Sequence, residues 1–393
     1  MERTVGNGVI FLVIMAYLTI MVKSLLNCKK QERDIIFLIF IYLAILLLNK
    51  VLRRSTASVS YHLVIIKYYL SYICMIPIYK QLNKKHLYFL LTIALATMAV
   101  TMLQNYQLKL KWRYLYSIHL YNTSGIKAII NTQYTSAILF VSGALLCGFL
   151  HAKSIVLKSI MLALTVTCVT FNMVVTQRGI ILLLTIFMFS LLVLFNTKVR
   201  TAKYQTLLFL LVCAITLFVF EYDKMLIWLG NATGSARLSA RLNSIITLIE
   251  ADDISEIKGD GSLFARLRLT VVSIQTFFSS IGRFLFGVGH RMDTNLLVGN
   301  HSQFFDEFTR WGIFGGILSF VLMLRMLKST IVFSDIGKNT IFYRQLMVII
   351  TTAIIRTFVG AVIDEAIGVA LFIIVSLIFK LLQVERIERG VVE

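Results

Sequence analysis

The chain has little proline, little cysteine and few acidic residues. Its 393 residues include one proline, five cysteines and 19 Asp+Glu, and only 15% of the residues are charged. A single proline argues against collagen-like segments and proline-rich linkers. The cysteines stand singly in or beside apolar runs, with no C-x-x-C pair and no Cys/His cluster. Neither a disulfide framework nor a zinc site is therefore expected.

Apolar and basic residues are abundant instead. Hydrophobic residues make up 58% of the chain, and 39 Lys+Arg give a formal net charge of +20. An ordinary soluble domain is roughly 45–50% apolar and about 25% charged, so a water-soluble fold could not bury this much apolar surface. The basic residues are interleaved with apolar runs, which is typical of membrane topology signals and does not point to nucleic acid.

The apolar runs predict an all-α, polytopic helical membrane protein. A bilayer core of ~30 Å needs about 20 apolar residues per helix. About eleven runs approach that length, within a range of about ten to twelve. They lie near 6–26, 35–49, 59–79, 87–103, 134–150, 155–175, 180–196, 206–221, 311–327, 345–363 and 365–382. The runs lack the two-residue alternation of strands, and unpaired backbone groups are too costly in lipid for open sheets.

A long stretch without a spanning run, 222–310, divides the chain. We expect about eight spans in 1–221 and about three in 311–393. Taking the C-terminal tail as cytoplasmic places several basic loops inside, as the positive-inside rule requires. These loops lie near 29–33, 80–85, 198–203 and 328–344, whereas the basic residues at 50–54 and 109–113 then fall outside. Counting three spans back from a cytoplasmic C-terminus places 222–310 outside the cytoplasm. Loops of such length are usually functional.

Part of this loop has an amphipathic pattern. Between 262 and 281, apolar residues such as Val271 and Phe278 form one stripe, while Arg266 and Ser273 lie on the opposite side. This pattern predicts a helix lying in the membrane interface with its polar face towards water.

His301 is the candidate general base. Asn300 is a suitable N-cap residue, and Gln303 follows at the capping-box spacing, which predicts His301 in the first turn of a helix. The positive end of a helix dipole disfavours an imidazolium, and a neutral imidazole can accept a proton. The alternative is a structural histidine at a membrane boundary. Asp306 is a nearby acid, although five residues along a helix place it about 140° around from His301.

Arginines are the candidate phosphate ligands, because their guanidinium groups bind phosphate oxygens in a bidentate manner. Arg178 lies in a turn between two apolar runs, and Arg266 and Arg268 lie on the amphipathic stretch. The alternatives are a snorkelling arginine for Arg178 and a generic lipid-headgroup contact for the other two. Secondary candidates for the same site are Asp306, Arg310, Arg237, Arg241 and Arg291.

Two cations, Lys67 and Arg356, lie inside predicted spans. Ionisable residues within a membrane are costly and usually functional, and either cation could pair with an acid inside the bundle. Asp364 and Glu365 stand at the start of the last run, where their role could be no more than to cap a helix.

Five short motifs in a fixed order carry a family resemblance. They are Gln177–Gly179, Arg266–Leu269, Phe286–Gly289, His301–Asp306 and Trp311–Gly315. In this order, around a large external loop, they resemble the bacterial O-antigen polymerase and O-antigen ligase superfamily, which acts on lipid-linked polysaccharides.

The resemblance implies a glycosyltransferase of the bacterial inner membrane with a cytoplasmic C-terminus and a periplasmic 222–310 loop. Donor and acceptor would be oligosaccharide repeat units on undecaprenyl diphosphate. Arg178, Arg266 and Arg268 would hold the diphosphate, and His301 would deprotonate the acceptor hydroxyl. No cofactor and no metal are expected, and a chain-length regulator protein would be a further partner. We favour a polymerase; the alternatives are a ligase that transfers polymer to lipid A core and a flippase or transporter of the same lipid.

Overall fold

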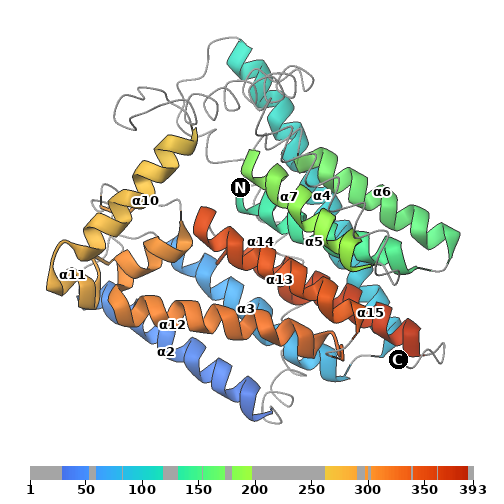
Figure 1. Ribbon diagram of the computed structural model, residues 1–393, viewed down its shortest axis with the longest axis horizontal. Helices are drawn as coiled ribbons and strands as arrows, with labels where there is room; N and C mark the ends of the chain where they lie inside the picture. The colour runs from blue at the N-terminus through green and yellow to red at the C-terminus, as the bar shows by residue number, and fades with distance from the viewer. Residues whose placement is uncertain are drawn as a thin grey trace.

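The computed structural model describes residues 29–52, 59–81, 83–117, 132–152, 154–172, 179–196, 262–289, 297–299, 302–337, 340–360 and 362–387. Within these ranges the chain is helical and contains no strand. The helices, shown in Figure 1, are α2 (Lys30–Leu52), α3 (Val59–Gln81), α4 (Lys84–Ser117), α5 (Thr132–His151), α6 (Ile155–Phe171), α7 (Gly179–Phe195), α10 (Ser262–Phe278), α11 (Ile281–Phe286), α12 (Gln303–Phe333), α13 (Ile341–Val359), α14 (Glu365–Gly368), the π-helical segment η6 (Val369–Val375) and α15 (Ser376–Ile387).

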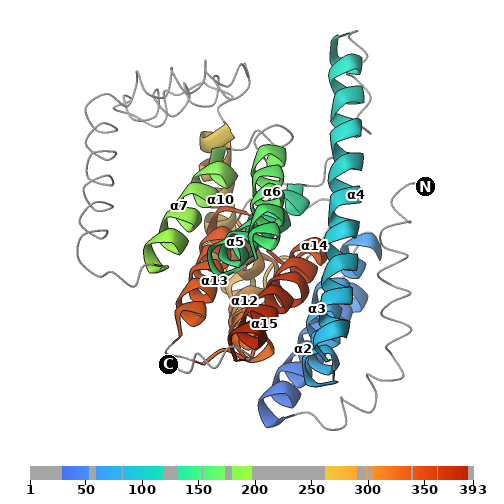
Figure 2. The ribbon, with the colours of Figure 1, turned by 90° about the vertical axis from the view of Figure 1, so that its right-hand side faces the viewer.

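Several of these helices are suited to cross a membrane. Five described segments are long and apolar enough: Leu63–Lys80, Lys84–Gln104, Gln303–Phe333, Ile341–Val359 and Glu365–Ile387. The chain is thus an all-α protein with the helices of a membrane protein, as the composition predicts. In Figure 2, α4 extends well past its neighbours because the helix continues to Ser117, beyond its apolar part. Since the runs at 6–26 and 206–221 lie outside the described residues, the number of about eleven spans stays a prediction.

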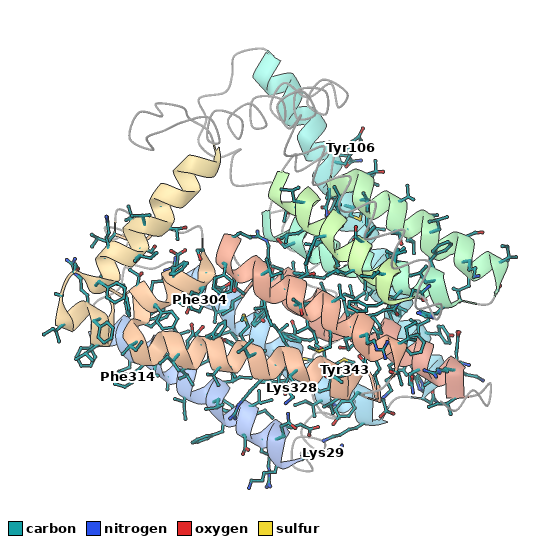
Figure 3. The ribbon with its side chains drawn as sticks, in the orientation of Figure 1. Lys29, Tyr106, Phe304, Phe314, Lys328 and Tyr343 are labelled. Atoms are coloured by element: carbon teal, nitrogen blue, oxygen red, sulfur yellow. The ribbon has the colours of Figure 1, made fainter. Side chains whose placement is uncertain are left out.

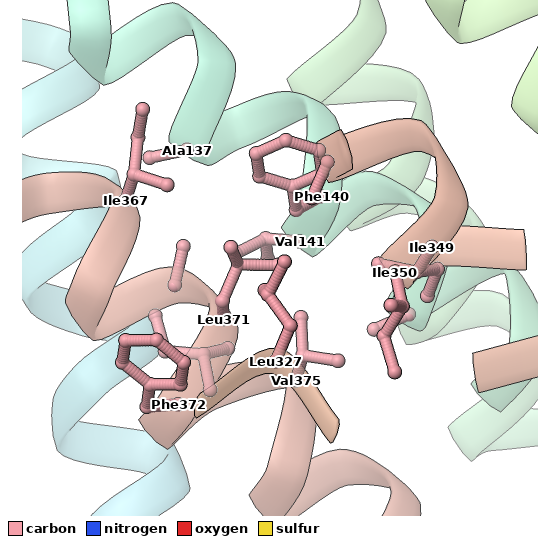
Figure 4. Close-up of a cluster of buried hydrophobic side chains, with 14 of the residues drawn as sticks. Ala137, Phe140, Val141, Leu327, Ile349, Ile350, Ile367, Leu371, Phe372 and Val375 are labelled. Carbon is pink, nitrogen blue, oxygen red and sulfur yellow. The ribbon is translucent and has the colours of Figure 1, made fainter. Parts of the chain in front are cut away.

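Helix α5 forms the centre of the bundle. It packs against α6, α7, α13, α14, η6 and α15, and side chains such as Ile138 and Phe140 are fully buried. Figure 4 shows Phe140 and Val141 facing Leu371 of η6 within the apolar core. Large apolar side chains on the outer helices are instead exposed, which is the arrangement expected where lipid surrounds the bundle. They include Phe37, Phe40, Phe89, Ile155, Leu183 and Phe314.

One end of the bundle collects basic residues. Near this end Lys80 forms an ion pair with Glu32 at 2.5 Å, and the Lys380 ammonium donates to the carbonyl of Tyr79. The Arg386 guanidinium lies 5.7 Å from the centre of the Phe342 ring. These contacts bring together the helix ends that the sequence places in basic loops near 29–33, 80–85 and 328–344. In Figure 3, Lys29 and Lys328 lie towards this end, whereas Phe304 and Phe314 lie towards the other.

Candidate functional site

At the end of the bundle away from the basic residues, α12 is broken and the break is capped by the turn after α11 (Figure 1). Gly312 has φ 70° and ψ −172°, so helical hydrogen bonding stops there. The backbone amides of Val288 and Gly289 donate to the carbonyls of Thr309 and Arg310, both at 2.9 Å. A helix break leaves such carbonyls without their usual partners, and the Gly-x-Gly turn supplies new ones. Two of the sequence motifs therefore meet in space.

Two glycines make this docking possible. Gly287 has φ 69°, and a Cβ at that position would lie 2.2 Å from the Arg310 carbonyl oxygen. A Cβ at Gly312 would lie 2.2 Å from the carbonyl oxygen of Leu285. Any other residue would therefore meet both an unfavourable backbone conformation and an opposing carbonyl group.

A buried polar junction joins α10 to α12. The Ser273 hydroxyl donates to Asp306 Oδ1 at 2.6 Å and accepts the amide of Gly299 at 2.8 Å. The Thr309 hydroxyl also contacts the Ser273 carbonyl oxygen at 2.8 Å. Ser273 and Thr309 are completely buried, and Asp306 is 3% exposed. α10 is therefore attached to α12 through polar groups in a water-poor environment, where such bonds are costly to lose.

This junction corrects the predicted orientation of the amphipathic helix. The helix is confirmed over Ser262–Phe278, but its polar face does not turn to water at Ser273, which faces α12. Val271 and Phe278 of the apolar stripe are 46% and 68% exposed, as expected of side chains that face lipid. The prediction was wrong at Ser273 because it took water as the only partner for the polar face, whereas Asp306 offers an acceptor within the protein.

Glu307 is a buried acid that the sequence analysis did not single out. It is 4% exposed, accepts the phenolic O–H of Tyr42 at 2.6 Å, and lies 3.9 Å from Nη1 of Arg310. The three-residue spacing between Glu307 and Arg310, just before the apolar run at 311–327, is the signal that could have revealed the pair. The interaction with Tyr42 connects α12 to α2.

The start of α12 differs from the prediction. Its N-cap is Ser302 and its first helical residue is Gln303, so Asn300 is not the N-cap and the first turn begins after His301. Gln303 does not close a capping box either. Its side-chain oxygen accepts the amides of Val362 and Ile363 at 2.5 and 2.7 Å. The first turn of α12 is thereby attached to the connection between α13 and α14.

The same connection carries the Asp364 cap and an ion pair. Asp364 is the N-cap of α14 and accepts the Ala366 amide at 3.0 Å, which confirms its predicted capping role. Burial raises the pKa of the Asp364 carboxyl to about 6; the neighbouring Glu365 adds to this shift, while the Ala366 amide and Lys67 oppose it. Lys67 pairs with Glu365 at 2.7 Å, which confirms that it pairs with an acid, although Glu365 was expected only as a helix cap.

Arg356 is buried in α13 beneath this connection. Its Nε donates to the Ser136 hydroxyl of α5 at 3.0 Å, and the residue is 4% exposed. A Cβ at Gly360 would lie 1.4 Å from Nη1 of Arg356, so the guanidinium occupies the space of a side chain at that position. The Gly360 carbonyl in turn accepts the amide of Gln303 at 3.2 Å.

The predicted site residues are described only in part. Asp306 and Arg310 lie together in the first part of α12, near the Gly-x-Gly turn. Arg266 and Arg268 lie on α10, with their side chains outside the described part. The other predicted residues lie outside the described residues: His301, Arg178, Arg237, Arg241 and Arg291.

Chemically, the described groups hold segments together more than they offer a reactive centre. Asp306 and Glu307 both accept short hydrogen bonds from hydroxyl groups. Within the described ranges, no three His, Cys, Asp or Glu side chains are grouped so as to hold a metal ion. Comparison of the chain with protein-family models and with curated proteins finds no match.

Proposed function

We propose that the chain is an O-antigen polymerase, a membrane glycosyltransferase that joins undecaprenyl-diphosphate-linked repeat units at the outer face of the bacterial inner membrane. The observation that carries the proposal is the meeting of motifs at one place. The Gly287–Gly289 turn contacts the helix that follows His301, and α10, the helix that bears Arg266, packs on the same helix. A single active site built from these motifs requires this convergence.

The distribution of charge supports the location. The basic helix ends gather at one end of the bundle, and the positive-inside rule assigns that end to the cytoplasm. The α10–α12 junction lies towards the opposite end (Figure 3), which is then the outer face. A lipid-linked donor in the outer leaflet presents its diphosphate at this face of the membrane.

In the proposed reaction, Arg178, Arg266 and Arg268 bind the diphosphate and stabilise the charge that develops as it leaves. His301 removes the proton from the acceptor hydroxyl. The acceptor oxygen forms a bond to the anomeric carbon of the donor, the bond between that carbon and the diphosphate breaks, and undecaprenyl diphosphate departs. No oxidant, metal or nucleotide sugar takes part.

A deletion strain tests this function directly through the gel pattern of its lipopolysaccharide. A polymerase defect leaves lipid A core bearing one repeat unit, and a plasmid copy of the gene restores the ladder. Polymer retained on the carrier with a bare core would identify a ligase instead. Repeat units retained in the cytoplasm would identify a flippase.

A further inference from the structure

Ser273 connects three segments that are distant in sequence. Its hydroxyl donates to Asp306 of α12 and accepts the amide of Gly299 in the loop before α12, while Ser273 itself belongs to α10. A serine hydroxyl has one donor and two acceptor positions, so these two bonds use the donor and one acceptor.

Asp306 determines how this hydroxyl is oriented. The O–H donates over 2.6 Å to a carboxyl oxygen, so this acceptor fixes where the hydroxyl hydrogen points. With the hydrogen directed to Asp306, the lone pairs of Ser273 are available to the Gly299 amide. Asp306 thus acts on the loop through Ser273.

The loop also fits closely against α10. A Cβ at Gly299 would lie 2.0 Å from the carbonyl oxygen of Leu269. The chain is attached again just after His301, because the Ser302 hydroxyl donates to the Thr357 carbonyl at 3.4 Å and the Gln303 amide donates to Gly360. Gly299 and Ser302, which stand on either side of Asn300 and His301 in the sequence, are therefore anchored, one on α10 and the other at the end of α13.

We propose that Ser273, oriented by Asp306, is a positioning residue that sets the segment carrying His301 relative to α10, the helix carrying Arg266. This inference rests on the proposed function and deepens it. Arg266 stands about two helical turns before Ser273, on the same face of α10. The Ser273 junction therefore sets the distance between the base and the arginine that holds the leaving group.

The first experiment measures how accessible the loop before α12 is to a labelling reagent, and it needs no enzymatic assay. A reporter cysteine, Val298→Cys, replaces a buried side chain of the same loop and is labelled with a maleimide in the detergent-purified protein. Ser273→Ala should raise the labelling rate about tenfold or more, because a buried hydrogen-bonded anchor is lost. Gly299→Ala should do the same without touching the hydroxyl. Ser273→Thr, which keeps the hydroxyl, should label close to the parent rate, and Asp306→Asn should give an intermediate rate.

Two controls separate release of the loop from loss of the fold. Ser279→Ala makes the same substitution just after α10, where the exposed hydroxyl donates to the Thr276 carbonyl and accepts from Arg283 of α11. Neither contact reaches the loop before α12, so the rate should stay unchanged. The buried thiol of Cys147 should stay unlabelled in every variant. Equal rates for Ser273→Ala and Ser279→Ala, or reaction of Cys147 together with the reporter, would overturn the anchoring role.

The second experiment measures chain extension by purified protein without the reporter, using lipid-linked repeat units extracted from the deletion strain. Ser273→Ala should lower kcat about 10- to 100-fold, since a displacement of about 1 Å can cost that much. The KM for the lipid-linked donor should stay within about twofold, because the diphosphate ligands are unchanged. An unchanged kcat in a variant whose loop labels faster would overturn the positioning role. Inactive wild-type protein would overturn the proposed function, and the labelling rates would still decide whether Ser273 anchors the loop.

Discussion

Tyr42 donates its phenolic O–H to Glu307 at 2.6 Å, a contact between residues 265 positions apart in the chain. Both side chains are buried. The bond connects α2 with the first part of α12, the same part whose next residues accept the Gly-x-Gly turn. The arrangement of the candidate site thus depends on a helix near the beginning of the described chain.

Tyr42→Phe should destabilise the protein by about 1–3 kcal/mol, the usual cost of removing one partner of a buried polar group. Thermal unfolding in detergent measures the change. Tyr72→Phe is the matched control, because Tyr72 is also buried but donates to the hydroxyl of Ser329 over a longer distance of 3.2 Å. It should cost less, and equal losses would contradict a special contribution from Glu307.

Gly312→Ala should reduce the amount of folded protein strongly. The substitution combines a positive φ, which costs more than about 1 kcal/mol, with a Cβ 2.2 Å from the Leu285 carbonyl oxygen. Gly282→Ala is the control, since no atom lies within 4 Å of a Cβ there and alanine favours a helix by roughly 0.5–1 kcal/mol. Fluorescence-detected size exclusion compares the two, and similar profiles would contradict the docking of α11 on α12.

Stability should depend on the protonation of Asp364. Its pKa is about 6 in the folded protein against an ordinary value of 3.8, so between these values the folded state binds more protons than the unfolded state. The free energy of unfolding should therefore fall as pH rises from about 4 to about 6 and level off above. Asp364→Asn keeps the cap on Ala366 and should lose this slope. An identical pH profile in the variant would assign the slope to another group.

His301→Ala should abolish chain extension while the protein still accumulates in the membrane, because a general base contributes about 10²–10⁴-fold. His301→Gln keeps a hydrogen-bonding side chain but cannot accept the proton, so it should be nearly as inactive. His119→Ala and His290→Ala are the controls and should keep most activity on lipopolysaccharide gels. If His301→Ala still made long chains and His290→Ala did not, the general base would be His290, in the turn after Gly289, and not His301.

Arg178→Lys and Arg266→Lys should each impair polymerisation although the positive charge remains. Lysine loses the fork that binds two phosphate oxygens at once. The gel ladder at matched protein level measures the effect. Full activity in both variants would show that these arginines contribute only positive charge at the membrane surface and do not bind the diphosphate.

Much of the architecture follows from local patterns. Long apolar runs form helices because a helix satisfies its backbone hydrogen bonds within the segment itself, and α3, α5 and α13 appear where such runs stand. An acidic partner for Lys67 was likewise predictable, since a cation within a span is costly unless it is paired. The period of apolar residues also revealed α10.

Orientation, helix starts and long-range partners required the folded chain. The N-cap position of α12 falls on Ser302 rather than on Asn300, and the Ser302 side chain makes no capping bond there. Its hydroxyl donates to the Thr357 carbonyl, while Gln303 accepts the amides of Val362 and Ile363. Ser273 faces inward because Asp306 is there to accept its hydrogen bond, and Glu307 is held by a tyrosine from α2. Periodicity records only neighbours within a few turns of the same helix, whereas these contacts join segments that meet only when the helices pack.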